Sequence, residues 1–130
     1  MRVLVCGSRD WLPSQPIFAM LNGIRSTNSK MVLIEGGAKG ADDVASKWAE
    51  MSLKPEDHLR FEAKWDEYEP KDRWRAGHDR NRLMLEEGKP TLVLAFKDDF
   101  NWKMDKGGTE NMVKIAKEAK VKTYVIQGVR

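Results

Sequence analysis

The sequence predicts an α/β protein: a single Rossmann-like domain over residues 1–130, with three layers and a mostly parallel sheet of about five strands. Apolar runs of strand type alternate with segments of helical periodicity, which is typical of βαβ units. Glycine-rich turns separate several of these strands from the helices that follow. A chain of 130 residues can form one sheet covered by helices, but it is too short for a separate substrate domain.

Three strands and two helices are expected in the first half of the chain. Apolar runs predict strands at 2–6, 31–34 and 58–63, the last of them more exposed. Ser14 can cap and Pro16 can open a helix with an apolar face of Ile17, Met20, Leu21 and Ile24. A second helix is expected after Gly40, with a face of Ala41, Val44, Ala45 and Trp48.

The second half is expected to hold two more helices and two more strands. After a long loop at 64–75, a helix is predicted from Gly77 to Glu87, with Gly88 as its C-cap and Pro90 preventing its continuation. The remaining elements are a strand at 91–96, a polar loop at 97–106, a helix at 109–120 and a last strand at 122–126.

Composition and charge narrow the class of function. The net charge of +3, with acidic and basic residues interspersed, suits an anionic ligand and lacks the basic stripe of a duplex-DNA binder. No apolar run approaches the roughly 20 residues of a membrane helix, so we expect a cytoplasmic protein with no membrane partner. Cys6 is expected to lie at the end of a buried strand and not to act as a nucleophile. No metal site is predicted, because His, Cys and carboxylates do not group together, and no cofactor is predicted.

The first two glycine-rich turns are the core of the predicted binding site, because open α/β sheets bind ligands at the carboxyl ends of their strands. The first turn, Gly7, Ser8 and Arg9, offers close backbone approach, a hydroxyl and a guanidinium that can hold a phosphate. The alternative for this segment is an ordinary turn at the end of a strand. In the second turn, backbone N–H groups, a helix N-terminus and a lysine favour a phosphate at Gly36, Gly37, Lys39, Gly40 and Asp42. The alternative is a tight connection in which Asp42 or Asp43 stabilises the first helical turn.

Two later segments are expected to face the same cleft. Gly107, Gly108 and Thr109 open a helix, where Thr109 can act as N-cap or hold a second anionic or sugar group. Arg80 and Asn81 are expected on the first turn of the preceding helix, where they either read a phosphate, ribose or base or are simply solvated. His78 is a lesser candidate for a general base, and His58 is expected to be structural.

Together these motifs resemble the YspA-like branch of the SLOG superfamily, which also contains the Lonely Guy phosphoribohydrolases and the Rossmann domain of DNA-processing protein A. The resemblance rests on Gly-Gly-Ala-x-Gly-Ala-Asp at 36–42 and Ala-Gly-x-x-Arg-Asn at 76–81, with support from 5–11 and the Gly108-Thr109 pair. Many small phage and bacterial proteins share this pattern. It implies a Rossmann-like fold that binds a nucleotide-derived ligand at the glycine-rich turns, often as a homo-oligomer. Met112 stands where Lonely Guy enzymes carry their catalytic glutamate, which argues against phosphoribohydrolase activity.

Three functions stay open, in this order. The first is binding of a nucleotide or nucleotide-derived small molecule, as a sensor or sequestering protein. The second is an N-glycosidic hydrolase or transferase acting on a nucleoside monophosphate or ADP-ribose compound, with Asp42, Asp79 and Glu110 as candidate catalytic carboxylates. The third is single-stranded nucleic-acid binding through aromatic residues in basic loops, namely Trp65, Trp74, Phe100 and Trp102. The alternative for these aromatics is that they fix the loops to the body of the protein.

Overall fold

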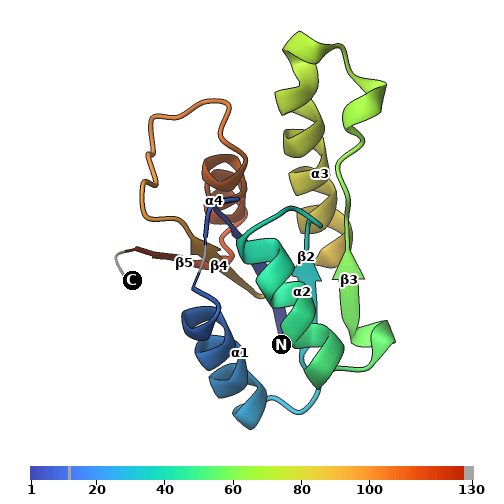
Figure 1. Ribbon diagram of the computed structural model, residues 1–130, viewed down its shortest axis with the longest axis vertical. Coiled ribbons are helices and arrows are strands. Elements are labelled where there is room, and N and C mark those ends of the chain that lie inside the picture. Colours follow the sequence, from blue (N-terminus) through green and yellow to red (C-terminus); the bar gives the residue numbers. More distant parts are fainter. Residues whose placement is uncertain (12, 128–130) are drawn as a thin grey trace.

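The sheet has five parallel strands in the order β3-β2-β1-β4-β5 (Figure 1). This arrangement comes from a computed structural model that describes residues 1–11 and 13–127. The strands are β1 (Arg2–Gly7), β2 (Val32–Glu35), β3 (His58–Arg60), β4 (Leu92–Phe96) and β5 (Lys122–Ile126). The helices are α1 (Gln15–Thr27), α2 (Ala41–Ser52), α3 (Arg73–Gly88) and α4 (Gly108–Glu118), with short 3-10 helices η1 (Pro55–Asp57), η2 (Trp65–Glu67) and η3 (Pro70–Asp72). The predicted Rossmann-like α/β class and its five-stranded parallel sheet are confirmed.

Helices cover both faces of the sheet and make the two outer layers. Alternate residues of β1 point to opposite faces, so Val3 and Val5 pack with α1 and α2, whereas Leu4 and Cys6 pack with α3 and α4. Each face is therefore a separate hydrophobic core, which explains why the central strands are apolar at nearly every position.

The chain reverses its direction of travel across the sheet between β1 and β4. The first units run outward from β1 through β2 to β3, and α3 then carries the chain back so that β4 pairs with the other edge of β1. Gly7 stands opposite Phe96 in this pairing, so β1 and β4 end side by side. The turns that follow these two strands therefore open into the same space (Figure 1).

The third helix differs most from the prediction. The segment 64–75 is not a plain loop, because it contains η2 and η3, and α3 begins at Arg73 rather than at Gly77. A glycine inside a helix usually costs roughly 1 kcal/mol relative to alanine, which made Gly77 look like a starting point. In the structure Gly77 packs against the indole of Trp65, since a Cβ there would lie 3.4 Å from Cη2 of that ring.

Smaller differences concern the ends of elements. Strand β3 stops at Arg60 instead of residue 63, and α4 ends at Glu118 instead of residue 120. The N-cap of α4 is Gly107 and not Thr109, while Ser14 holds the N-cap of α1 without a side-chain capping bond. Gly88 is the last residue of α3, and Lys89 is the C-cap in the left-handed region at φ 50°. Met20, expected on the apolar face of α1, is 39% exposed. Within the described residues, no helix is long and apolar enough to cross a membrane.

Candidate functional site

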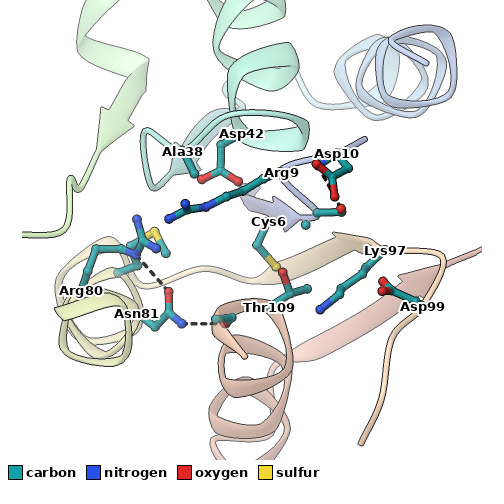
Figure 2. Close-up of a pocket in the computed structure, with 14 residues that line it drawn as sticks. Cys6, Arg9, Asp10, Ala38, Asp42, Arg80, Asn81, Lys97, Asp99 and Thr109 are labelled. Carbon is teal, nitrogen blue, oxygen red and sulfur yellow. Dashed lines mark hydrogen bonds between the residues drawn. The ribbon is translucent and has the colours of Figure 1, made fainter. Parts of the chain in front are cut away.

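A pocket of about 310 Å³ lies where β1 and β4 end, at the reversal point of the sheet (Figure 2). This volume lies at the lower end of the range of small-molecule sites, and the location is where open α/β sheets bind ligands. We call it the first pocket, and its lining consists of Cys6, Gly7, Ser8, Arg9, Asp10, Ala38, Asp42, Arg80, Asn81, Met84, Lys97, Asp99, Gly108 and Thr109.

A second pocket, of about 340 Å³, adjoins the first. Arg9, Ala38 and Arg80 line both pockets, so these three residues form the boundary between them. The rest of the second pocket is made of Gly36, Gly37, Lys39, Glu62, Ala63 and Trp65. The predicted binding residues are thus divided between two adjoining spaces, while Gly40 lines a different depression beside Trp11 and Gly107 lines none of the pockets described here.

The first turn is fixed by its backbone to the start of α2. The carbonyl of Ser8 accepts the N–H groups of Trp11 and Ala41, each at 3.2 Å. This requires the chain at Gly40 to pass very close to Ser8. The φ of Gly40 is 74°, and a Cβ there would lie 2.1 Å from the Ser8 carbonyl oxygen. The guanidinium of Arg9 extends over the pocket from this fixed turn and lies 5.5 Å from the ring centre of Trp65.

In the second turn, the N–H groups of Gly36 and Gly37 point at carboxylates of the protein. Gly36 donates to Oδ2 of Asp42 at 2.8 Å, and Gly37 donates to Oε1 of Glu35 at 2.6 Å. Glu35 is fully buried, and its other oxygen accepts bonds from His58 Nε2 and Arg60 Nε, both at 2.8 Å. The N–H groups of Gly36 and Gly37 therefore already have acceptors, and a bound anion must be held by other groups.

Asp42 is buried on α2 and lines the first pocket. Its burial raises the pKa of the carboxyl from 3.8 to about 6, although the nearby Arg80 guanidinium and the backbone amides of Gly36 and Ala38 act in the opposite direction. A carboxyl with this pKa gains or loses a proton near neutral pH, which is the property that a general acid or base in the pocket requires.

Arg80 and Asn81 project from the middle of α3, not from its first turn as predicted, because the helix begins at Arg73. Nη1 of Arg80 donates to the carbonyl of Gly36 at 2.6 Å, and Nε donates to Oδ1 of Asn81 at 3.0 Å. Nδ2 of Asn81 in turn donates to the carbonyl of Gly108 at 2.8 Å (Figure 2). Burial lowers the pKa of Arg80, while nearby Asp42 opposes this shift. The pair thus links the second turn to the start of α4.

The start of α4 supplies the remaining wall of the first pocket. In the described part of the chain, no protein acceptor takes the backbone N–H groups of Gly108 and Thr109. These groups stand at the positive end of the helix, where an anion is stabilised. Glu110 lies outside the lining: it is buried and accepts two bonds from Lys97 Nζ, at 3.0 and 2.9 Å, and one from the N–H of Asn101 at 3.1 Å.

The other candidate catalytic groups lie away from the first pocket or are poorly suited to it. Asp79 accepts a hydrogen bond from the Tyr68 hydroxyl and lines a small separate pocket of about 110 Å³. His78 stacks edge-on against Trp74 with 5.0 Å between ring centres, and its burial lowers its pKa. Cys6 lines the first pocket, but burial raises the pKa of its thiol well above the usual range, so it stays protonated. Among the described residues, no group of three or more His, Cys, Asp or Glu side chains is arranged to hold a metal ion.

The aromatic residues considered for nucleic-acid binding do not form one surface loop. Trp65 lies in η2 and Trp74 lies in α3, so the prediction that Trp74 is in a loop is wrong. Phe100 and Trp102 pack edge-to-face in the 97–106 segment, with 4.8 Å between ring centres. Trp102 is 59% exposed, and Lys117 Nζ lies 5.1 Å from its ring centre.

Sequence reasoning missed several residues of the first pocket, among them Asp10, Lys97 and Asp99. The signal that could have found Lys97 is its position, because it is the first polar residue after β4, just as Ser8 follows β1. Met84 carries no such signal, since an apolar residue of this kind is usual in any helix, whereas Ala38 belongs to the 36–42 segment that the resemblance places in the pocket.

The fold and the first pocket define a Rossmann-like α/β protein with a ligand-sized cavity at the reversal point of its sheet. The chain belongs to the YAcAr family, described as the YspA, cpYpsA-related SLOG family, whose family model matches residues 1–68. It is 33% identical over 102 residues to the Gene 61 protein of Mycobacterium phage D29, which covers 73% of this chain and 75% of that protein. The resemblance to the YspA-like branch of the SLOG superfamily is confirmed.

A solved structure shows a similar fold. It is DNA processing protein A from Helicobacter pylori, described for its single-stranded DNA binding mode, and it matches with a TM-score of 0.67. The match covers 100% of this chain and 67% of the other, at 18% sequence identity. At this identity the likeness concerns the fold.

Proposed function

We propose that this protein binds a nucleotide or nucleotide-derived small molecule in the first pocket and acts as its sensor or sequestering protein. The observation that carries the proposal is the Arg9 guanidinium, which lines the pocket at the reversal point of the sheet and forms no ion pair with a described residue. An arginine held over a pocket without a carboxylate partner favours a phosphate or carboxylate ligand.

The surroundings of Arg9 support a phosphate in particular. The unpaired N–H groups of Gly108 and Thr109 stand across the pocket, and Lys97 Nζ is held beside them by Glu110. Helix N-termini and basic side chains are frequent partners of phosphate oxygens. Membership of the SLOG family and the fold shared with a DNA-binding protein agree at a coarse level with nucleotide or nucleic-acid recognition.

Isothermal titration calorimetry tests this proposal. The ligands are mononucleotides, cyclic nucleotides, ADP-ribose and a single-stranded oligonucleotide, and the variants are Arg9→Gln and the control Lys114→Gln, an exposed residue outside both pockets. We expect a small nucleotide to bind and Arg9→Gln to weaken it about tenfold or more, since a charge-assisted bond contributes about 1.5–3 kcal/mol. Absence of binding across the small molecules contradicts the proposal. If the oligonucleotide binds and Arg9→Gln leaves that binding unchanged, the aromatic segments are favoured as the binding site instead.

A second candidate function is supported by Asp42. It is the one of the three candidate carboxylates that lines the first pocket, and its pKa is raised to about 6 by burial. A carboxyl with this pKa can protonate a leaving base or stabilise the developing positive charge on a ribose carbon. We therefore propose N-glycosidic hydrolysis of a nucleoside monophosphate or ADP-ribose compound as the alternative.

Chromatography of nucleotide incubations tests the alternative. Release of free base by the wild-type protein, lost in Asp42→Asn and retained in Asp79→Asn, supports hydrolysis, because Asp79 faces a different pocket. Binding without any released base leaves the sensor or sequestering function standing and rules out the hydrolase.

A further inference from the structure

We infer that the second pocket is the base subsite of the nucleotide whose phosphate occupies the first pocket, and that Trp65 is the residue against which the nucleobase stacks. This inference rests on the proposed function and adds to it the ligand class and the way in which the ligand lies. It excludes phosphate-bearing ligands without an aromatic ring, such as sugar phosphates, as the preferred partners.

The two pockets are joined through charged side chains. Arg9 and Arg80 line both, and the nearness of the two positive charges contributes to the lowered pKa of Arg80. An anion at this boundary reduces the repulsion between the guanidiniums, so the boundary is a favourable place for a group that bears negative charge. A ligand with its phosphate there or in the first pocket has the second pocket within reach on the other side.

Trp65 is held where it can form one wall of the second pocket. Its indole is half-buried, and Cη2 faces α3 at Gly77, where a Cβ would lie 3.4 Å away, at ordinary contact distance. The guanidinium of Arg9 lies 5.5 Å from the ring centre, so a planar cation and a planar aromatic stand together at the pocket. Both groups stack readily on nucleobases.

The remainder of the lining suits the edge of a base. Lys39 provides a hydrogen-bond donor and Glu62 an acceptor, and both are exposed enough to adjust to a ligand. Nucleobase edges combine donors and acceptors, whereas a sugar phosphate has no aromatic face to place on Trp65. The pocket volume of about 340 Å³ is sufficient for a single ring system.

The test compares two ligands that differ only in the base. Calorimetry is carried out with ribose 5-phosphate and with the mononucleotide that binds best among AMP, GMP, CMP and UMP. We expect the wild-type protein to bind the mononucleotide at least about fivefold more tightly, because stacking of one base on an aromatic residue usually contributes this much or more. Trp65→Ala should remove this difference and leave binding of ribose 5-phosphate unchanged, while Trp65→Phe should retain most of it.

Unchanged binding of ribose 5-phosphate also shows that Trp65→Ala is folded, and Trp102→Ala serves as a control because that exposed residue lies outside both pockets. Equal affinity of the wild-type protein for the two ligands overturns the base subsite and leaves the phosphate pocket standing. Equal weakening of both ligands by Trp65→Ala also overturns it, since Trp65 would then act only on the shape of the pocket. If neither ligand binds, the proposed function fails and the base subsite fails with it.

Discussion

The carboxylate of Asp42 accepts the backbone N–H of Gly36 at 2.8 Å, so the protein supplies its own anion to the glycine-rich turn after β2. Arg80 completes the arrangement by donating to the carbonyl of the same glycine at 2.6 Å. A phosphate at that point would have to displace a buried side chain. The proposed phosphate position therefore lies on the opposite wall, between Arg9 and the start of α4.

The raised pKa of Asp42 makes folding stability depend on pH in a definite direction. The pKa of about 6 in the folded protein exceeds the ordinary aspartate pKa of 3.8, which we take for the unfolded chain. This carboxyl therefore contributes stability below about pH 4, and the contribution is lost as the pH rises through 6. Asn at this position cannot ionise. The unfolding free energy of the wild-type protein relative to Asp42→Asn should thus fall by up to roughly 3 kcal/mol between pH 4 and pH 7. Urea unfolding at several pH values measures this, and a constant difference would show that the carboxyl has an ordinary pKa.

Gly36→Ala should disturb the pocket through Arg80. The added Cβ would lie 2.3 Å from Nη1 and 2.7 Å from Cζ of that side chain, so the guanidinium must leave its bond to the Gly36 carbonyl. We expect a loss of about 1–3 kcal/mol in stability. Gly23→Ala is the matched control, because its Cβ meets nothing within 4 Å and alanine favours the helix by roughly 0.5–1 kcal/mol. Thermal unfolding compares them, and a Gly36→Ala protein as stable as wild type would contradict this role of the glycine.

Glu110→Gln should affect stability rather than the chemistry of the pocket. Glu110 is buried in a two-oxygen contact with Lys97, whose side chain is only 14% exposed, and it also accepts the Asn101 N–H. Removing one charge of such a pair costs about 3 kcal/mol because the other stays buried without its partner. Denaturant unfolding measures the loss. Normal stability combined with loss of base release would instead return Glu110 to a catalytic role.

Most of the fold could be predicted from the sequence because its elements depend on local patterns. The strands β1, β2 and β4 are apolar runs bounded by polar turns, and the predicted last strand agrees with β5 at both ends. The start of α3 could not be predicted in this way, because the helix begins at Arg73 and continues through Gly77, which lies beside the indole of Trp65, twelve positions earlier in the chain. Tertiary contacts of this kind override the local preference of glycine.

The candidate site was only partly predictable for a similar reason. Glycine-rich turns after parallel strands indicate where a ligand can lie, and Gly7, Ser8, Arg9, Arg80 and Thr109 do line one pocket. The sequence does not show which N–H groups already have partners. The N–H groups of Gly36 and Gly37 donate to the carboxylates of Asp42 and Glu35. These bonds depend on how α2 and β2 meet in three dimensions.

Chemical-shift mapping of the ¹⁵N-labelled protein titrated with a mononucleotide tests the central claim most directly. A ligand in the first pocket should shift the amide signals of Ser8, Arg9, Gly108 and Thr109 in a saturable manner. The signals of Lys30 and Lys54, which line a different depression beside the ends of α1 and α2, should stay in place. Saturable shifts confined to the segment around Trp102, or no shifts at millimolar nucleotide, would contradict a nucleotide site at the reversal point of the sheet.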